Sequence, residues 1–130
     1  MDSRIKYKII YMVFSICLIL NVPISYSFEK NNERHYQEVW CKNNGGKLEV
    51  SLPDRTRCDC ITNSHAVEVE FARKWAEAIG QSLYYSLQTG KSAGIVLIIA
   101  SNKEYKYYLR LNTTIKEFKL PIDTWIIDLR

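Results

Sequence analysis

Three carboxylates and a polar helix stripe behind them are the residues of this chain best placed to do chemistry. Asp59 lies in one short strand-like segment, and Glu68 and Glu70 share one face of the next. Carboxylates that converge on one point form a hard oxygen site of the kind that binds Mg²⁺. Such a metal holds a phosphate and lowers the pKa of an attacking water. The pattern therefore favours phosphodiester hydrolysis.

The elements around these acids are expected to bring them together. Side chains on paired strands lie within about 5 Å of each other, so Asp59 and Glu68 converge if their strands pair. The backbone carbonyl of Val69 is then a further oxygen ligand. One stripe of the following helix is expected to position a phosphate or a base, and it carries Lys74, Glu77, Gln81 and Tyr85.

Hydrophobic periodicity assigns most of the chain to helices and strands. Apolar and polar residues alternate over 47–52, and the apolar run over 93–100 is typical of a strand buried on both faces. The predicted elements are helix 29–44, strands 47–52, 57–62 and 65–71, helix 73–89, strand 93–100, a helix from Ser101 or Asn102 to about 119, and strand 123–129. This order predicts an α/β fold with a mixed central sheet flanked by helices.

The two later helices are expected to turn apolar stripes toward the sheet. On helix 73–89 the inward side chains are predicted to be Trp75, Ile79, Leu83 and Leu87. On the last helix they are predicted to be Tyr105, Tyr108, Leu109, Ile115 and Phe118.

The first 27 residues have the layout of a secretory signal peptide. Arg4, Lys6 and Lys8 give a basic start, and the apolar run from Ile9 to Leu20 is short for a membrane span. A proline and two serines follow, which favours cleavage after Ser27. The alternative is an uncleaved amino-terminal anchor. Cleavage predicts one secreted or periplasmic domain over 28–130, without stable membrane insertion.

Three cysteines follow the leader, and export places them in an oxidising compartment. Cys58 and Cys60 point to the same face of one strand, and either can reach Cys41 on the preceding helix. Cys41–Cys60 is the favoured disulfide. The rival is a zinc site in which the three thiols join His35 or His65, but Cys-x-Cys is an unusual zinc spacing.

The charge of the chain identifies no partner by itself. The whole sequence carries a net charge of +4, which falls to about +2 without the leader. This bias is too weak to indicate nucleic acid from charge alone. Tyr105, Tyr107 and Tyr108 lie beside Lys103 and Lys106 and are able to stack bases, but an amphipathic surface helix is the preferred interpretation.

Asp59, then Glu68-x-Glu70, then Gln81-x-x-x-Tyr85 follow one another in an order that resembles the PD-(D/E)XK nuclease superfamily, in particular its RecB-like branch. The resemblance covers most of the chain beyond the leader. It implies a restriction-endonuclease-like α-β-β-β-α-β core and Mg²⁺- or Mn²⁺-dependent cleavage of DNA or RNA. It also implies that Asp59 and Glu68 bind the metal, that Glu70 is a third ligand or a base, and that Gln81 and Tyr85 contact the nucleic acid.

The chain departs from the superfamily pattern at the motif lysine, where it has Glu70. Lys74, at the start of the following helix, is the expected replacement for the missing cation at the phosphate. The resemblance further implies an acidic residue from the first helix, for which Glu38 and Glu33 are the candidates.

Two alternatives to an exported nuclease stay open. The first is a catalytically degenerate member of the same fold, acting as a secreted module that binds a protein or nucleic-acid partner. Glu70 at the lysine position and the weak net charge favour it. The second is a disulfide-stapled envelope protein with a structural role.

Overall fold

A computed structural model describes residues 24–130, with side chains from Glu33 onward. Asn32–Arg130 form one compact unit, and the description below concerns that unit. The predicted leader lies outside the described residues, apart from residues 24–27 at the start of helix α2. The elements are α2 (Ile24–Asn43), β1 (Lys47–Ser51), β2 (Arg57–Ile61), β3 (His65–Phe71), the 3₁₀ turn η1 (Ala72–Lys74), α3 (Trp75–Thr89), β4 (Ser92–Ile99), the 3₁₀ turn η2 (Asn102–Glu104), α4 (Tyr105–Glu117) and β5 (Ile122–Asp128).

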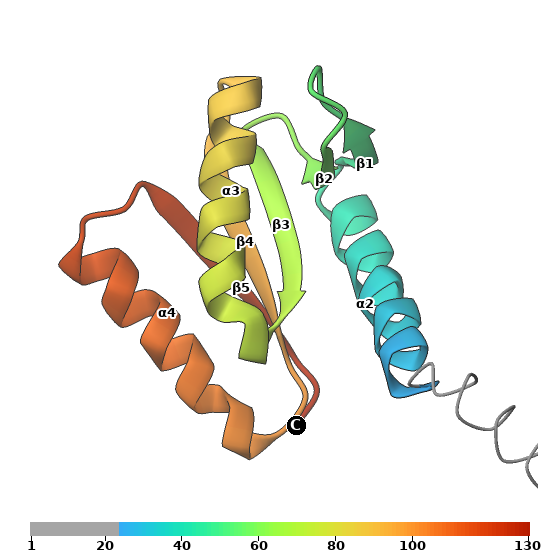
Figure 1. The fold of residues 1–130 in the computed structure, drawn as a ribbon, viewed down its shortest axis with the longest axis vertical. Coiled ribbons are helices and arrows are strands. Elements are labelled where there is room, and N and C mark those ends of the chain that lie inside the picture. The colour runs from blue at the N-terminus through green and yellow to red at the C-terminus, as the bar shows by residue number, and fades with distance from the viewer. Residues whose placement is uncertain (1–23) are drawn as a thin grey trace, which may run out of the picture. The chain divides into compact units, whose positions relative to one another are not determined.

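The five strands form one mixed sheet in the order β1-β2-β3-β4-β5. The pairs β1–β2 and β2–β3 are antiparallel, whereas β3–β4 and β4–β5 are parallel and are joined through α3 and α4. Figure 1 shows α3 and α4 on one side of the sheet and α2 on the other. The predicted mixed α/β architecture is confirmed, and each strand begins and ends within one residue of its prediction.

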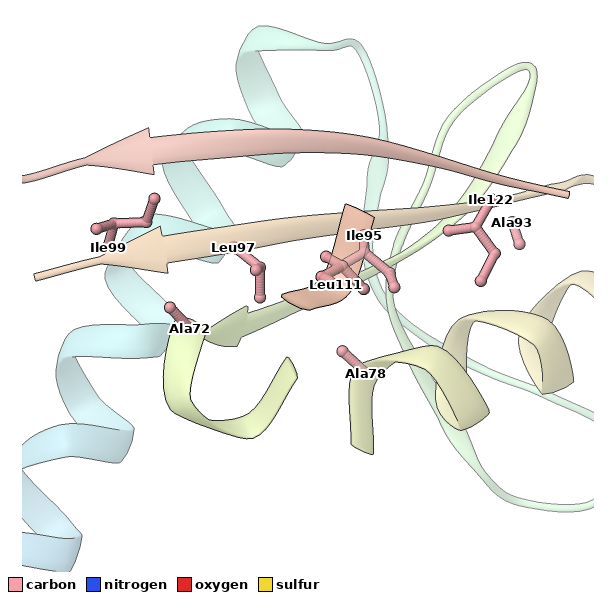
Figure 2. Close-up of a cluster of buried hydrophobic side chains, with 8 residues drawn as sticks. All are labelled: Ala72, Ala78, Ala93, Ile95, Leu97, Ile99, Leu111 and Ile122. Atoms are coloured by element: carbon pink, nitrogen blue, oxygen red, sulfur yellow. The ribbon is translucent and has the colours of Figure 1, made fainter. Parts of the chain in front are cut away.

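Two apolar layers bury both faces of the sheet. The layer toward α3 and α4 consists of Ala72, Ala78, Ala93, Ile95, Leu97, Ile99, Leu111 and Ile122 (Figure 2). The layer toward α2 consists of Cys41, Cys60, Val67, Val69, Phe71, Val96 and Ile98, with Tyr36, Trp40, Leu48, Trp125 and Ile127 packed against it. Strand β4 supplies both layers, which explains its unbroken apolar sequence.

One inward prediction on α3 is wrong. Trp75, Ile79 and Leu83 pack on the core, but Leu87 is 77% exposed. Each four-residue step advances about 40° around a helix, so three steps turn Leu87 about 120° from Trp75. The fully inward stripe instead holds Ala78, Ser82 and Tyr85.

The predicted inner face of α4 is also partly wrong. Leu109 is 53% exposed and Phe118 is 72% exposed, whereas Leu111, which was not predicted, is completely buried. Leu111 lies three residues after Tyr108 and four before Ile115, so it shares their stripe. Neither Ser101 nor Asn102 caps this helix through its side chain.

The predicted disulfide between Cys41 and Cys60 is confirmed, and it ties α2 to β2. Cys58 stays a buried free thiol, so the three-thiol zinc alternative is incompatible with this structure. The backbone at Gly46 lies against the bridge, because a Cβ there would come within 2.4 Å of Cys60 Sγ and 2.8 Å of Cys41 Sγ. Over residues 24–130, no helix is both long and apolar enough to span a bilayer.

Reduction of the disulfide is expected to destabilise the domain. The bridge joins residues 19 apart in sequence, and closing a loop of this size stabilises a fold by about 3 kcal/mol. Urea unfolding with and without dithiothreitol measures the difference. An unfolding midpoint that is unchanged by reduction would contradict this prediction.

Alanine at position 46 is expected to destabilise the protein by about 1–3 kcal/mol, because its methyl group overpacks against the two sulfurs. Gly80 is the matched control. It lies inside α3 with no atom within 4 Å of a built Cβ, so Gly80→Ala is expected to stabilise by about 0.5–1 kcal/mol. Thermal unfolding of both variants gives the comparison, and equal effects would contradict it.

Candidate acidic site where strands β2 and β3 separate

The site begins where the pairing of β2 with β3 ends. Pairing is present at Cys60–Val67 and Ile61–Ala66, and the same register would next place Asp59 opposite Glu68 and then Cys58 opposite Val69. Instead, the backbone N–H of Val69 donates to Oδ2 of Asp59 at 2.9 Å. The Asp59 carboxylate therefore replaces a backbone partner and lies directly against β3.

Strand β3 buries two glutamates. Glu68 and Glu70 alternate with Val67, Val69 and Phe71, so they point to the face opposite the α2 layer. Taken as whole residues, Glu68 is only 4% exposed and Glu70 only 5% exposed. A carboxylate with so little water needs a proton, a cation or hydrogen-bond donors around it.

Glu68 obtains such compensation only in part. Its carboxyl group shares a hydrogen bond with Asp59, the acid that approaches from β2. Its Oε2 atom is buried and has no hydrogen-bond partner among the residues that the structure describes. One oxygen in the acidic site therefore points at a position that no donor of the described chain fills.

Glu70 is held by three groups. The backbone N–H of Phe71 donates to Oε1 at 2.9 Å, and Lys74 Nζ lies 3.4 Å from Oε2. Glu33, on α2, shares a further hydrogen bond with it. The turn η1 places Lys74 four residues after Glu70, which lets the ammonium group reach back over the end of β3.

Burial and mutual repulsion raise the pKa values of Glu68, Asp59 and Glu33. Removal from water raises the pKa of Glu68 to about 10, and the nearby Asp59 and Glu70 carboxylates add to the effect. Burial likewise raises the pKa of Asp59 to about 6, against the opposing hydrogen bonds from Val69 and Glu68. The pKa of Glu33 is raised to about 8, by burial first and then by its contact with Glu70.

Lys74 is the positive group of the site. Burial disfavours its charged form, but the carboxylates of Glu70 and Glu33 outweigh that effect and raise its pKa. Lys74 is therefore a charged ammonium group at neutral pH. Its side chain is 38% exposed, compared with 7% for that of Glu70, so it also faces solvent at the edge of the site.

Helix α3 brings a tyrosine to the acids. Tyr85 is 6% exposed and packs with Leu52, Cys58 and Ala66. Burial, followed by the charges of Glu68 and Asp59, raises its pKa, so the phenol stays protonated. Gln81, one turn earlier and exposed to solvent, hydrogen-bonds the same tyrosine.

The structure separates the two candidates on the first helix. Glu33 joins the acidic site, whereas Glu38 forms an exposed ion pair with Arg34 at 2.9 Å. Gln37 was missed from sequence: it is 4% exposed, and its Nε2 donates to the backbone carbonyl of Asp59 at 3.1 Å. The sequence signal that could have identified Gln37 is its position one turn after Glu33 on the inward side of α2.

The donor set suits a hard divalent cation held by few protein ligands. No three His, Cys, Asp or Glu side chains in the described part of the chain surround one point as a ready metal cage. Mg²⁺, however, is commonly held by one or two carboxylates, with waters and phosphate oxygens completing its shell. The Asp59–Glu68 pair, with its unpartnered Oε2, fits that smaller requirement.

Comparison of the chain with protein-family models, with curated proteins and with solved structures finds no match. The resemblance to PD-(D/E)XK nucleases therefore rests on the residues and their order alone.

The acidic site predicts an unusual dependence of stability on pH. Raised pKa values mean that the folded protein keeps protons which the unfolded chain has already lost above about pH 4.5. The contribution of the site to stability is therefore fully present below that pH. It falls steadily as pH rises above about 4.5, and the loss is complete once pH has risen through about 8 for Glu33 and about 10 for Glu68.

Glu68→Gln tests this origin, because an amide mimics the protonated acid at every pH. In EDTA at pH 8, the variant is expected to melt above the wild type, by about 4–8 °C for each kcal/mol regained. Glu38→Gln, which changes an exposed acid of α2, is the control and should have little effect. A lower melting temperature for Glu68→Gln would show that the carboxylate is not under electrostatic stress.

Proposed function

We propose that this protein is an exported, metal-dependent nuclease that hydrolyses phosphodiester bonds in DNA or RNA. The observation that carries the proposal is the buried pair Asp59–Glu68, whose Oε2 oxygen lacks a partner, beside a charged lysine. Buried acids with raised pKa values and a specific charge partner are typical of functional sites. The order of these residues along the chain, which resembles the PD-(D/E)XK superfamily, supports the same activity.

Asp59 and Glu68 are the residues that would hold Mg²⁺ or Mn²⁺. When bound, the metal supplies Lewis-acid activation of a phosphate and a more acidic water. The protein prepares for it by holding Asp59 in place through the Val69 N–H and by keeping Glu68 desolvated. A cation that displaces the proton of the pair relieves the repulsion between the two acids.

Lys74 would contact the phosphate from the solvent side of the site. Its ion pair with Glu70 sets the position of Nζ at the end of β3, and its partial exposure leaves room for a substrate oxygen. Glu70 then acts through Lys74, or as a third ligand or a base for water. Tyr85 and Gln81, on the neighbouring helix, would orient the nucleic acid.

Export is the proposed location, and the disulfide supports it. Cys41–Cys60 is compatible with an oxidising compartment, where such bridges persist. The predicted signal peptide supplies the route. A nuclease that acts outside the cytoplasm is also kept away from the DNA of its own cell.

A catalytically degenerate binding module is the second candidate. Two observations favour it: Glu70 occupies the position of the motif lysine, and no ready three-ligand metal cage exists among the described side chains. In such a module the acidic site and the Gln81–Tyr85 stripe would recognise a partner without cleaving it.

Cleavage of plasmid and single-stranded DNA and of RNA, with Mg²⁺, Mn²⁺ or EDTA, tests the activity. Asp59→Asn and Lys74→Met are each expected to lower the rate by about 10²–10³-fold, which is the usual cost of losing one group that stabilises a transition state. Glu38→Gln and Lys91→Met are the matched controls for charge, and both should cleave like the wild type.

Melting in the presence of metal separates the two candidates. Mg²⁺ or Mn²⁺ should raise the melting temperature of the wild type, because a ligand that binds only the folded state stabilises it, and Asp59→Asn should lose this gain. Metal-dependent stabilisation without cleavage of any nucleic acid would favour the binding module. Absence of both would overturn the proposed metal site.

A further inference from the structure

A second site lies on the opposite face of the sheet. A pocket of about 260 Å³ is lined by the aromatic rings of Trp40, His65 and Trp125 and by the polar loop residues Asn44, Gly45, Thr62, Asn63 and Ser64. Trp40 and Trp125 pack on the α2 layer, whereas the acids point the other way. We propose that this pocket binds a neutral sugar unit, independently of the proposed nuclease activity.

The aromatic wall is fixed in place. His65 is hydrogen-bonded at both ring nitrogens: Nε2 donates to Asp123 Oδ2 at 2.8 Å, and Nδ1 lies 2.7 Å from Ser64 Oγ. Its ring packs edge-on against Trp125, with 5.2 Å between the ring centroids. The ring centroids of Trp40 and Trp125 are 5.4 Å apart. A rigid wall loses little conformational entropy when a ligand binds against it.

Hydrogen-bonding groups at the pocket are left unused. Among the described residues, no acceptor is paired with the indole N–H of Trp40 or Trp125, and the side-chain amide of Asn63 has no partner. Asn44 donates through Nδ2 to the Trp40 carbonyl at 2.8 Å, which leaves its Oδ1 free to accept. Sugar hydroxyls both donate and accept, so they match this mixture of groups.

The charges around the pocket disfavour a nucleotide. No Lys, Arg, Asp or Glu lines it. One acid, Asp123, lies behind His65, and one base, Lys91, donates to the backbone carbonyl of Asn63 at 2.7 Å. No Lys or Arg side chain among the lining residues is there to hold a phosphate, so a neutral ligand fits best.

The shape of the wall favours a puckered ring over a flat base. The planes of Trp40 and Trp125 are inclined at 52°, so they form no parallel slot into which a base stacks. The C–H face of a sugar needs one aromatic surface and hydroxyl partners at its edge. The volume lies slightly below the range of about 300–1,000 Å³ for drug-sized ligands, which suits one ring and not a long oligosaccharide.

Intrinsic tryptophan fluorescence tests the proposal, because two of the three tryptophans of the protein line the pocket. Glucose, N-acetylglucosamine and galactose are titrated separately into the purified protein. For a ligand of about a dozen non-hydrogen atoms, the expected dissociation constant is on the order of 1 mM. Trp75→Phe, on the other face of the sheet, should keep the full response.

Asn63→Ala removes an exposed loop amide and is expected to weaken binding about fivefold, the effect of one lost hydrogen bond, without changing the melting temperature. Trp125→Phe keeps an aromatic ring but removes the indole N–H, and should weaken binding similarly. A fluorescence response to adenosine but to no sugar would overturn the proposal and identify a nucleobase as the ligand. No saturable response to any sugar, at concentrations far above the expected constant, would overturn the proposal.

Discussion

The burial of two glutamates in β3 is the constraint on which the rest of the acidic site depends. A central strand with both faces covered has no water to solvate Glu68 and Glu70, so each charge has to be met by another group. Glu68 shares a hydrogen-bonded proton with Asp59, and Glu70 is compensated by Lys74 and by the backbone N–H of Phe71. Separation of β2 from β3 is part of this arrangement, because it lets the Asp59 carboxylate accept from the backbone N–H of Val69 where the ladder ends.

The same constraint explains why α2 and η1 matter to the site. Glu33 reaches Glu70 from α2, and the Cys41–Cys60 bridge holds the far end of that helix against β2. The turn η1 stops β3 from continuing and lets Lys74 turn back toward Glu70. Two separate segments of the chain thus supply a proton and a positive charge to a single buried strand.

Much of the fold was predictable from sequence because strand and helix periods differ so clearly here. The alternation in β1 and β3 and the apolar run of β4 are clear strand signals. The predicted first and last residues of all five strands lie within one residue of the observed ones. Helix faces were predicted less well, since a four-residue spacing drifts around the helix and carried Leu87 into solvent. Leu109 lies outside the narrow stripe of α4 that touches the core, and Phe118 lies just beyond the end of that helix.

The chemistry was predictable only as far as it was local. Glu68 and Glu70 share a face by strand geometry, and Lys74 follows at a spacing that one turn can close. Contacts that depend on the third dimension were not accessible in the same way. The choice of Glu33 over Glu38 is set by how α2 lies on the sheet, and the pairing of His65 with Asp123 joins residues 58 apart.

The acidic site and the proposed sugar pocket, on opposite faces of one sheet, differ in their demands on stability. His65 is held by hydrogen bonds at both ring nitrogens, and Trp40 and Trp125 are held by ring contacts, so this wall contributes to folding whether or not a ligand is present. The acidic site is under electrostatic stress, because its carboxyl groups are buried away from water and lie close enough to repel one another when charged. A domain of this size has little stability to spare. The disulfide and the two apolar layers therefore offset the cost of holding the acids together.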